Sequence, residues 1–560
     1  MKSDNHAHVD LQTVFKDSID TEKQLADKFA TFFQNKVETL KKPSNASEIF
    51  DKLANVMGDV PRWDLTPCTT EDVAKAIDDL KPSLSSGPDS IPNRLIKSLK
   101  FEALEALTYV FNKCIMDGVF PKVWKSGKVL PTFKKGAKNR IENYRPICLY
   151  SNLGKLLEAV IGKQMTSHME KVLPNNMYGF RPSRSTQDAV GHALDKVHRY
   201  RAQGKKVGII SMDASSAFDL LEHEIILRSL DIIGAGPVAK EWCRSFLSDC
   251  SNFVQIGDSR SDVWLIKYGS GQGRRLSPNM FNLASISQAL FCLISDFIGY
   301  ADDGLDIVYG ETEDECNSKL QYVVNERLAW YSEIGLSLNM SKTEIVGIGY
   351  TPAPINLESI VILPKSEITF LGTTIQSDLK WSNQISSLCN KIRSAAGRIR
   401  HEGRNLTILE RRSLYMGWIQ SQIHYNARVI LPIISATELS AIQTASNAGI
   451  RAVVGLPKYG YADIATIRST LGIQTVETII EYTLQGAAWK KFSSTEPSPK
   501  VGPQTRSATN KNRPHPDQRG HLAKTSEALL TKAWNRMPLN IKTAPSLKNV
   551  KAQLKSLLYQ

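Results

Sequence analysis

Residues 299–310, with the sequence GYADDGLDIVYG, place two adjacent acids between two apolar runs. The runs on either side of Asp302 and Asp303 predict two strands joined at the acids. Asp303-Gly304 is a common tight-turn dipeptide between apolar strands, and a solvated hairpin turn explains both acids without a function. The alternative is a metal site at this turn, which requires a further acid close by.

A candidate for that further acid is Asp213, which ends the apolar segment KKVGIISMD (205–213). An acid in this place often caps a following helix, and the spacing of apolar residues in AFDLLEHEIILRSL (217–230) predicts one. If Asp213 lies beside Asp302 and Asp303, the three carboxylates raise one another's pKa unless a cation lies between them. Mg²⁺ prefers such oxygen ligands, and two ions about 4 Å apart can hold both the attacking and the leaving oxygen of a phosphoryl transfer.

A glycine-rich segment, YGSGQGRRLSP (268–278), lies between these acids in the sequence. Gly269, Gly271 and Gly273 permit backbone conformations and close ligand approaches that other residues do not. Ser277-Pro278 is typical of the N-cap and first position of a helix, which we expect to run to about residue 293. A glycine-rich loop before a helix can bind a phosphate or a sugar, although a plain turn explains the same residues.

The net charge favours a polyanionic partner, either nucleic acid or an anionic membrane surface. Lysine and arginine number 70 against 56 acids, which gives a formal charge of +14. The eight cysteines include no CxxC pair, which argues against zinc knuckles and for a reducing, intracellular compartment. The start of the chain has no apolar signal segment, and no run of 18 apolar residues predicts a membrane-spanning helix.

Nine segments, taken in order, resemble the reverse transcriptases of non-LTR (LINE-type) retrotransposons, most closely the jockey-like group. They cover most of the chain: SSGPDSIPNRLI (85–96), VLPTFKKGAKNRIENYRPICLYSNLGKLLE (129–158), NNMYGFRPSRSTQDAV (175–190), SMDASSAFD (211–219), GQGRRLSP (271–278), YADD (300–303), GLSLNMSKTEIVGIG (335–349), ITFLGTTIQSDLKWSNQI (368–385) and WNRMPLNIKTAPSLKNVKAQLKSLL (534–558). Each segment is modestly specific, and their common order makes a chance match very improbable.

The resemblance implies an α+β right-hand polymerase with an antiparallel-sheet palm, α-rich fingers and a helical thumb. It implies an RNA-directed DNA polymerase that adds deoxynucleotides to a primer 3′-hydroxyl. The expected divisions are a helical N-terminal lead-in (1–65), fingers and the start of the palm (66–205), palm (206–380), thumb (381–493), a flexible linker rich in Ser, Thr and Pro (494–522) and a small C-terminal helical module (523–560). The helical spacing of Leu25, Phe29, Phe32, Phe33 and Val37 supports a helix in the lead-in.

The same resemblance assigns catalytic roles to the three acids. Asp213, Asp302 and Asp303 would bind two Mg²⁺ ions, or Mn²⁺ in their place. Phe218 would be the steric gate that excludes a 2′-hydroxyl, although without the motif an ordinary core aromatic residue is the favoured interpretation. Gln272 would lie near the nucleotide sugar.

Further residues are expected to bind the other parts of the substrates. Lys135 and Arg145 would contact the triphosphate, with Lys134 as a competitor for the role of Lys135. Lys342 would close on the palm, and Leu371 and Gly372 would hold the primer end. The basic residues of the thumb would follow the phosphates of an RNA template and a DNA primer: Lys391, Arg393, Arg398, Arg400 and Arg404.

Some residues depart from the family pattern. The family usually has proline at the position of Gly271, and a small residue followed by an aliphatic one at the positions of Arg274 and Arg275. The two arginines would either strengthen phosphate contact or mark decay, so a catalytically inactive copy that binds nucleic acid is the alternative function.

An RNA-dependent RNA polymerase would use the same kind of palm and metal-binding acids, but a bulky Phe218 should exclude ribonucleotides and therefore disfavours this function. Residues 1–65 are too short for the family's endonuclease, so a truncated copy, a separate reading frame or a gene fragment is expected.

Overall fold

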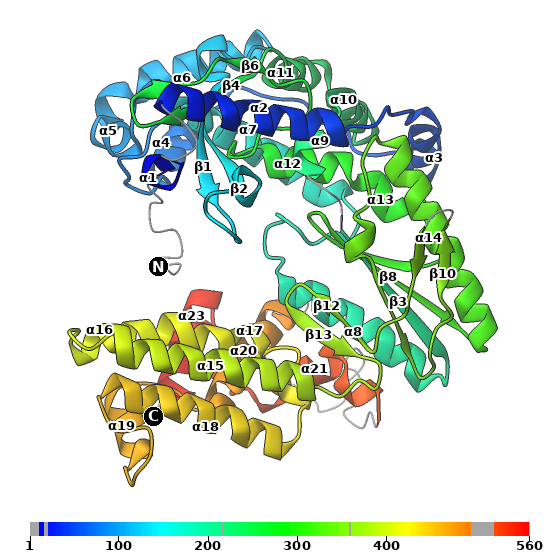
Figure 1. Ribbon diagram of the computed structural model, residues 1–560, viewed down its shortest axis with the longest axis vertical. Helices are drawn as coiled ribbons and strands as arrows, with labels where there is room; N and C mark the ends of the chain where they lie inside the picture. Colours follow the sequence, from blue (N-terminus) through cyan, green and yellow to red (C-terminus); the bar gives the residue numbers. More distant parts are fainter. Residues whose placement is uncertain are drawn as a thin grey trace, which may run out of the picture.

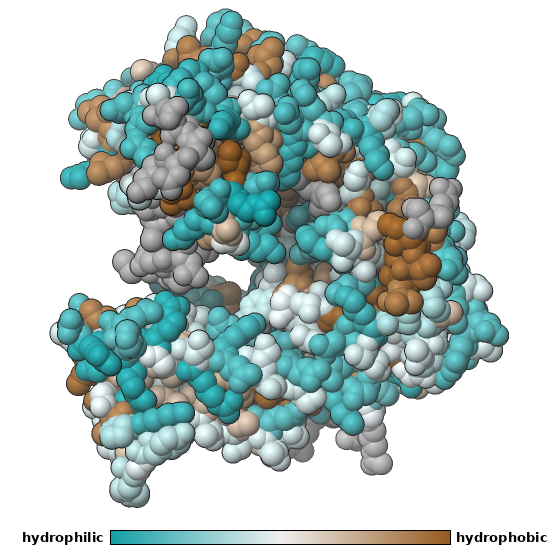
Figure 2. All heavy atoms as spheres, viewed as in Figure 1, coloured by the Kyte–Doolittle hydropathy of each residue, from teal (hydrophilic) through white to brown (hydrophobic). Residues whose placement is uncertain are grey.

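The computed structural model describes residues 11–15, 21–213, 217–292, 294–357, 360–493 and 520–558. Its elements follow an arc, with helices and a mixed sheet at the top, a second sheet at the right and helices below (Figure 1). An opening between the upper and lower parts remains when all atoms are drawn, and mostly hydrophilic residues surround it (Figure 2). Residues 494–519 of the predicted linker lie outside the described residues.

The palm sheet contains four antiparallel strands in the order β7-β8-β3-β9. Their bounds are β3 (Lys206–Asp213), β7 (Asp296–Tyr300), β8 (Asp303–Gly310) and β9 (Glu344–Ile348). Alternate residues of β3 face opposite sides of the sheet. Ile209 packs in the cluster that includes α8 (Thr186–Ala202), whereas Ile210 packs with α14 (Glu313–Glu333). Both faces of the sheet are therefore covered by helices, as the continuously apolar β3 segment predicts.

The upper part of the arc contains a second sheet that the sequence did not reveal. Strands β1 (Ser126–Phe133) and β2 (Tyr144–Leu149) form an antiparallel hairpin, and β1 also pairs in parallel with β4 (Ser251–Ile256). The short strands β5 (Ser259–Arg260) and β6 (Trp264–Leu265) both pair with β4. The helices of this part are α1 (Leu11–Phe15), α2 (Glu22–Leu40), α3 (Ser47–Met57), α4 (Thr70–Asp78), α5 (Asn93–Ser98), α6 (Lys100–Met116), α7 (Asn152–Val172), α9 (Ala217–Leu220), α10 (His223–Ile232), α11 (Pro237–Leu247), α12 (Ser277–Ala284) and α13 (Ile286–Phe291).

The lower part of the arc is helical and shares one hydrophobic core with the palm sheet. The cluster contains Ile307 of the sheet, Ile450 of the helical part and Leu554 near the end of the chain. The C-terminal helices are therefore not a separately cored unit. Two small hairpins, β10 (Ile355–Leu357) with β11 (Ile360–Ile362) and β12 (Glu367–Phe370) with β13 (Thr373–Gln376), precede the helices α15 (Ser382–Glu402), α16 (Ile408–Tyr415), α17 (Ser421–Asn426), α18 (Ala436–Val453), α19 (Ile464–Thr470), α20 (Val476–Phe492), α21 (Ser526–Arg536), α22 (Leu539–Lys542) and α23 (Leu547–Leu558).

All eight cysteines lie in described segments, where each is buried and free. Within the described residues, no helix is both long enough and apolar enough to span a bilayer.

A histidine pair joins the C-terminal helices to the palm and makes stability depend on pH. His198 of α8 is fully buried, and its ring nitrogen lies 3.2 Å from that of His521. Burial, followed by the charges of His521 and Lys524, lowers the pKa of His198 to about 4. Because the folded state disfavours the protonated form, this contribution to stability is complete above pH 6.5 and is lost as the pH falls toward 4.

We therefore expect wild type to lose up to about 3 kcal/mol of unfolding free energy relative to His198→Gln between pH 6.5 and 4. The comparison with the variant is essential because burial raises the pKa of Asp195 to about 6 and gives the opposite pH slope. Urea unfolding at both pH values measures the difference. Parallel pH profiles for the two proteins would contradict the assignment.

Candidate active site

The hairpin turn beside Asp302 and Asp303 is not at the position that the sequence predicted. The turn that joins β7 to β8 consists of Ala301 and Asp302, and Ala301 has a φ of +55°. Asp303 pairs with Tyr300 across the hairpin, so Asp303-Gly304 is strand and its prediction as the turn was wrong. On the other side of β8, Asp303 is the register partner of Asp213. The antiparallel pairing therefore brings the three acids to one end of the palm sheet.

The environment of the acids disfavours their negative charge. Burial, followed by the charges of Asp302 and Asp213, raises the pKa of Asp303 to about 6. Burial and the Asp213 charge also raise the pKa of Asp302, against the opposing effects of Lys342 and Arg145. A cation close to these carboxylates would relieve their repulsion.

Lys342 already supplies one positive charge to this group. It ends the 3₁₀ segment η3 (Met340–Lys342), which the backbone hydrogen bond from Asn339 N–H to the Asp213 carbonyl places beside β3. Its ammonium lies 2.5 Å from Asp213 Oδ2. This ammonium occupies one of the two oxygens of the Asp213 carboxylate.

The donor chemistry fits a divalent metal, although the side chains are not gathered around one point. Three carboxylates at one sheet end are the hard oxygen ligands that Mg²⁺ takes, and the raised pKa of Asp303 indicates uncompensated charge. Within the described segments, no three Asp, Glu, His or Cys side chains converge closely enough to hold an ion.

A cavity of about 670 Å³ opens beside the acids. Six of the predicted site residues line it: Asp213, Asp302, Arg145, Phe218, Gln272 and Lys342. Among the described residues, the lining includes Lys134 rather than Lys135, so Lys134 is the better placed of the two. The lining also includes residues of α2, which the sequence did not associate with the site.

The three glycines of the predicted loop all have positive φ, at +81° for Gly269, +78° for Gly271 and +105° for Gly273. A Cβ on Gly273 would lie 2.2 Å from the Cys148 carbonyl oxygen. Proline, which fixes φ near −65°, cannot occupy the Gly271 conformation. At Gly271, the backbone therefore has a conformation that the proline expected from the family pattern could not adopt.

The helix after this loop differs from its prediction. Leu276, not Ser277, is the N-cap, and α12 stops at Ala284 before α13 begins. The Ser277 hydroxyl instead donates to the Ser270 carbonyl at 2.8 Å and to that of Gly271. This side chain closes the loop rather than capping the helix.

Arg274 points away from the cavity, contrary to the predicted phosphate contact. Its guanidinium is buried between the rings of Tyr150 and Phe246, 4.5 Å from each centroid. It donates to the Phe246 carbonyl at 3.0 Å. The carboxylate of Glu158 accepts the backbone N–H groups of Arg275 and Leu276. These contacts hold the loop that carries Gln272, so Arg274 is a structural residue here.

Gln272 itself is fixed toward the cavity by an acid. Its side-chain amide donates to Asp219 Oδ2 at 2.9 Å. Burial raises the pKa of Asp219 to about 6. The sequence reading did not single out Asp219, although it lies in the same AFD segment as Phe218.

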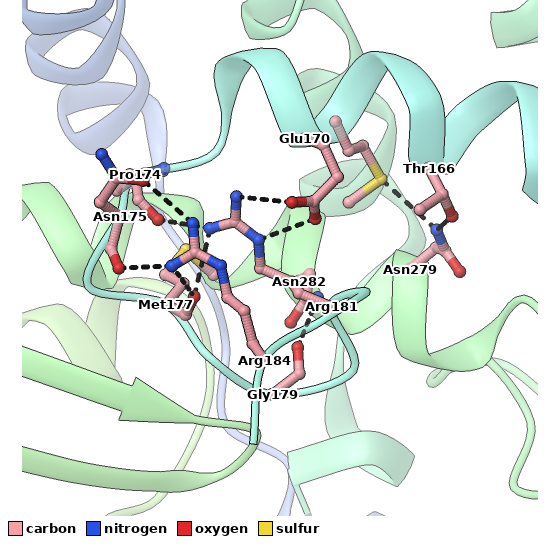
Figure 3. Close-up of polar contacts among 11 residues, drawn as sticks. Thr166, Glu170, Pro174, Asn175, Met177, Gly179, Arg181, Arg184, Asn279 and Asn282 are labelled. Atoms are coloured by element: carbon pink, nitrogen blue, oxygen red, sulfur yellow. Dashed lines mark hydrogen bonds and ion pairs between the residues drawn. The ribbon is translucent and has the colours of Figure 1, made fainter. Parts of the chain in front are cut away.

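Two arginines, Arg181 and Arg184, hold the loop that connects α7 to α8 (Figure 3). Arg181 forms a two-point ion pair with Glu170, at 2.8 and 3.2 Å, and donates to the carbonyl of Met177. Arg184 donates to both the carbonyl and the side chain of Asn175.

The loop that these arginines hold carries Gly179, whose carbonyl accepts the side-chain amide of Asn282. A Cβ on Gly179 would lie 2.3 Å from the Ala301 nitrogen. The clamped loop thus packs directly on the Ala301–Asp302 turn.

Phe218 is half-buried in an aromatic group beside the cavity. Its ring stacks on Phe281 at 4.3 Å and meets the edge of Phe180 at 5.8 Å. These two contacts fix the position of the ring, while its remaining surface lines the cavity.

If Phe218 is the predicted steric gate, Phe218→Ala is expected to raise the use of ribonucleotides relative to deoxynucleotides by roughly tenfold to a hundredfold, because a smaller side chain leaves room for a 2′-hydroxyl. The ratio of kcat/KM for the two nucleotides measures this change. Phe218→Tyr keeps the ring and serves as the control, with selectivity unchanged. Equal selectivity in the Ala variant and wild type would remove the gate assignment.

The predicted primer-binding residues lie on a separate hairpin. Leu371 and Gly372 form the β12–β13 turn, both with positive φ, and the Tyr425 hydroxyl donates to the Leu371 carbonyl. Neither belongs to the described lining of the cavity. Their role in holding a primer stays a prediction.

The basic residues of α15 have divided roles. Arg398 pairs with Glu402 at 3.0 Å, and Arg400 donates to the Leu456 carbonyl at 3.0 Å. Lys391 and Arg393 are exposed. The Arg398 pair lies within α15, whereas the Arg400 contact joins α15 to the segment that follows α18.

Residues 133–375 match the family described as reverse transcriptase (RNA-dependent DNA polymerase). The probable RNA-directed DNA polymerase from transposon BS of Drosophila melanogaster is 26% identical over 439 residues, covering 74% of this chain and 47% of the relative. The RNA-directed DNA polymerase from mobile element jockey of Drosophila funebris is 23% identical over 410 residues, covering 70% and 44%. The putative 115 kDa protein in type-1 retrotransposable element R1DM of Drosophila melanogaster is 28% identical over 365 residues, covering 62% and 35%.

The chain spans about half the length, or less, of these curated relatives. The matched segment contains the whole palm sheet, the glycine-rich loop and the three acids. Residues 133–375 are therefore a reverse transcriptase domain with the α+β fold of a right-hand polymerase, and the chain is related to the reverse transcriptases of non-LTR retrotransposons.

Proposed function

We propose that the chain is an RNA-directed DNA polymerase that transfers a deoxynucleotide to a primer 3′-hydroxyl opposite an RNA template. The observation that carries the proposal is the β3–β8 register, which places Asp213 beside Asp303 and the Asp302 turn at the edge of a cavity of about 670 Å³. Cationic side chains and an aromatic ring line the same cavity, as a nucleoside triphosphate requires.

Each wall of the cavity offers a different contact to the substrates. Asp213, Asp302 and Asp303 would hold Mg²⁺, or Mn²⁺ in its place, and the metal would supply positive charge to the reacting phosphate oxygens. Lys134 and Arg145 would hold the triphosphate tail through charge-assisted hydrogen bonds.

The nucleotide sugar, the primer and the template would contact other residues. Phe218 would lie under the sugar and exclude a 2′-hydroxyl, and Gln272, held by Asp219, would orient the sugar from the loop. The primer end would approach the Leu371–Gly372 hairpin, and the template would pass through the hydrophilic opening (Figure 2). Little covalent chemistry is required of the protein, so positioning and charge neutralisation supply the rate enhancement.

Primer extension tests the proposal. Purified protein, a DNA primer on an RNA template, Mg²⁺ and deoxynucleotides should give full-length product. A chelator should abolish the product, and ribonucleotides should not support it. Primer–template binding without any extension, under both Mg²⁺ and Mn²⁺, would instead favour an inactive copy that binds nucleic acid.

A further inference from the structure

Helix α2, which precedes the family-matched segment, is docked firmly on the upper sheet. Its buried Phe29 lies 5.3 Å, ring to ring, from Tyr144 of β2. An ion pair of 2.8 Å joins Lys23, near the start of the helix, to Asp262. Just beyond its end, the largely buried Lys41 pairs with Glu222 at 2.7 Å. Helix α2 therefore has a fixed position, alongside β4 and α9 (Figure 1).

Another face of α2 forms a wall of the cavity that contains Asp213 and Asp302. Gln34, Lys36 and Val37 belong to the lining. The Lys36 side chain is exposed, and it forms no ion pair or hydrogen bond with any described residue. Burial raises the pKa of Asp219 and lowers that of Lys134, and the Lys36 charge opposes the first shift and adds to the second. Lys36 therefore adds a positive charge to the lining of the cavity, close enough to act on Asp219 and Lys134.

The cations of the cavity come from more than one wall. Lys134 and Arg145 belong to the β1–β2 hairpin, and Lys342 is engaged by Asp213. Lys36 comes from α2 and has no carboxylate partner among the described residues. A triphosphate carries several negative charges and is best held by cations from different directions.

We propose that Lys36 binds the triphosphate of the incoming nucleotide, so that helix α2 is a structural part of the nucleotide site. This inference rests on the proposed polymerase function. It assigns a substrate contact to a segment outside residues 133–375.

The test compares Lys36→Ala with Lys28→Ala, an exposed lysine on the same helix that does not line the cavity. Loss of one charge-assisted contact should raise the KM for deoxynucleotides about tenfold in the Lys36 variant. The kcat and the primer–template affinity should change by less than about twofold, since the contact is uniform in ground and transition states. Lys36→Arg should restore the KM, and inorganic tripolyphosphate should inhibit Lys36→Ala more weakly than wild type.

Direct binding separates this inference from the function on which it rests. Displacement of a fluorescent dATP analogue by tripolyphosphate needs no turnover, so it reports on Lys36 even if wild type makes no product. Absence of product from wild type counts against the polymerase proposal alone. Equal KM and equal displacement for the two lysine variants would overturn the Lys36 assignment, as would weaker primer–template binding with an unchanged KM.

Discussion

Replacing Asp302 by Asn is expected to lower the rate of primer extension by at least about a thousandfold, with primer–template affinity nearly unchanged. The amide has the shape of the carboxylate but cannot supply its charge to a metal ion. Burial and the neighbouring Asp213 raise the pKa of Asp302, so the folded state is destabilised by this charge at neutral pH. Removing it should therefore leave the thermal midpoint unchanged or slightly higher.

The combination of lost activity and retained stability is what distinguishes a catalytic acid from a structural one. Single-turnover extension, filter binding of primer–template and thermal denaturation measure the three quantities on the same preparation. Asp51→Asn, at an exposed position of α3, is the matched control and should extend as wild type does. Extension within about tenfold of wild type by Asp302→Asn would exclude Asp302 from the catalytic set.

The largest expected effect on stability concerns a buried ion pair behind the catalytic strand. Asp306 of β8 and Arg327 of α14 are both fully buried, and their side chains form two hydrogen bonds of 2.8 and 2.9 Å. Ser295 donates to the same carboxylate at 2.6 Å, and the guanidinium lies 4.4 Å from the ring centroid of Phe297. Arg327→Met should lower the unfolding free energy by about 3–5 kcal/mol, because Asp306 then remains buried without its partner.

Two further variants test the cause of that loss. Arg327→Met combined with Asp306→Leu should recover most of the stability, since an apolar pair of similar volume can replace a buried ion pair. Arg398→Met breaks the more exposed pair with Glu402 and should cost less than about 1 kcal/mol. Urea denaturation measures all three. A loss of similar size for Arg327→Met and Arg398→Met would show that burial does not set the strength of the Asp306 pair.

Local patterns in the sequence predict the strands that carry the three acids, and the observed pairing places these acids at one end of the palm sheet. The continuously apolar segment ending at Asp213 and the two runs around Asp302 fix strands, and antiparallel pairing brings their ends together. The turn was misplaced because the preference of Asp-Gly for turns is weaker than the cross-strand register, which keeps Asp303 in β8. Turn propensity describes four residues, whereas register is decided by the whole hairpin.

Residues whose position depends on distant segments could not be placed from the sequence. Arg274 is buried because rings from residues 150 and 246 surround it, and neither ring is near it in the chain. Helical spacing predicted α2 correctly, but not the Tyr144 contact that brings Lys36 to the cavity. The choice between Lys134 and Lys135 likewise depends on how the β1–β2 hairpin faces the cavity.

The shared hydrophobic core has a consequence for modularity. Strand β1 begins before residue 133, Tyr144 is covered by Phe29, and the palm strands pack in the same cluster as Leu554. Excising residues 133–375 would expose apolar surface on the upper sheet, where Phe29 covers Tyr144, and on the palm face that packs with the C-terminal helices. The segment that matches the family is therefore not an independent folding unit, and a stable excised domain must include residues from both flanks.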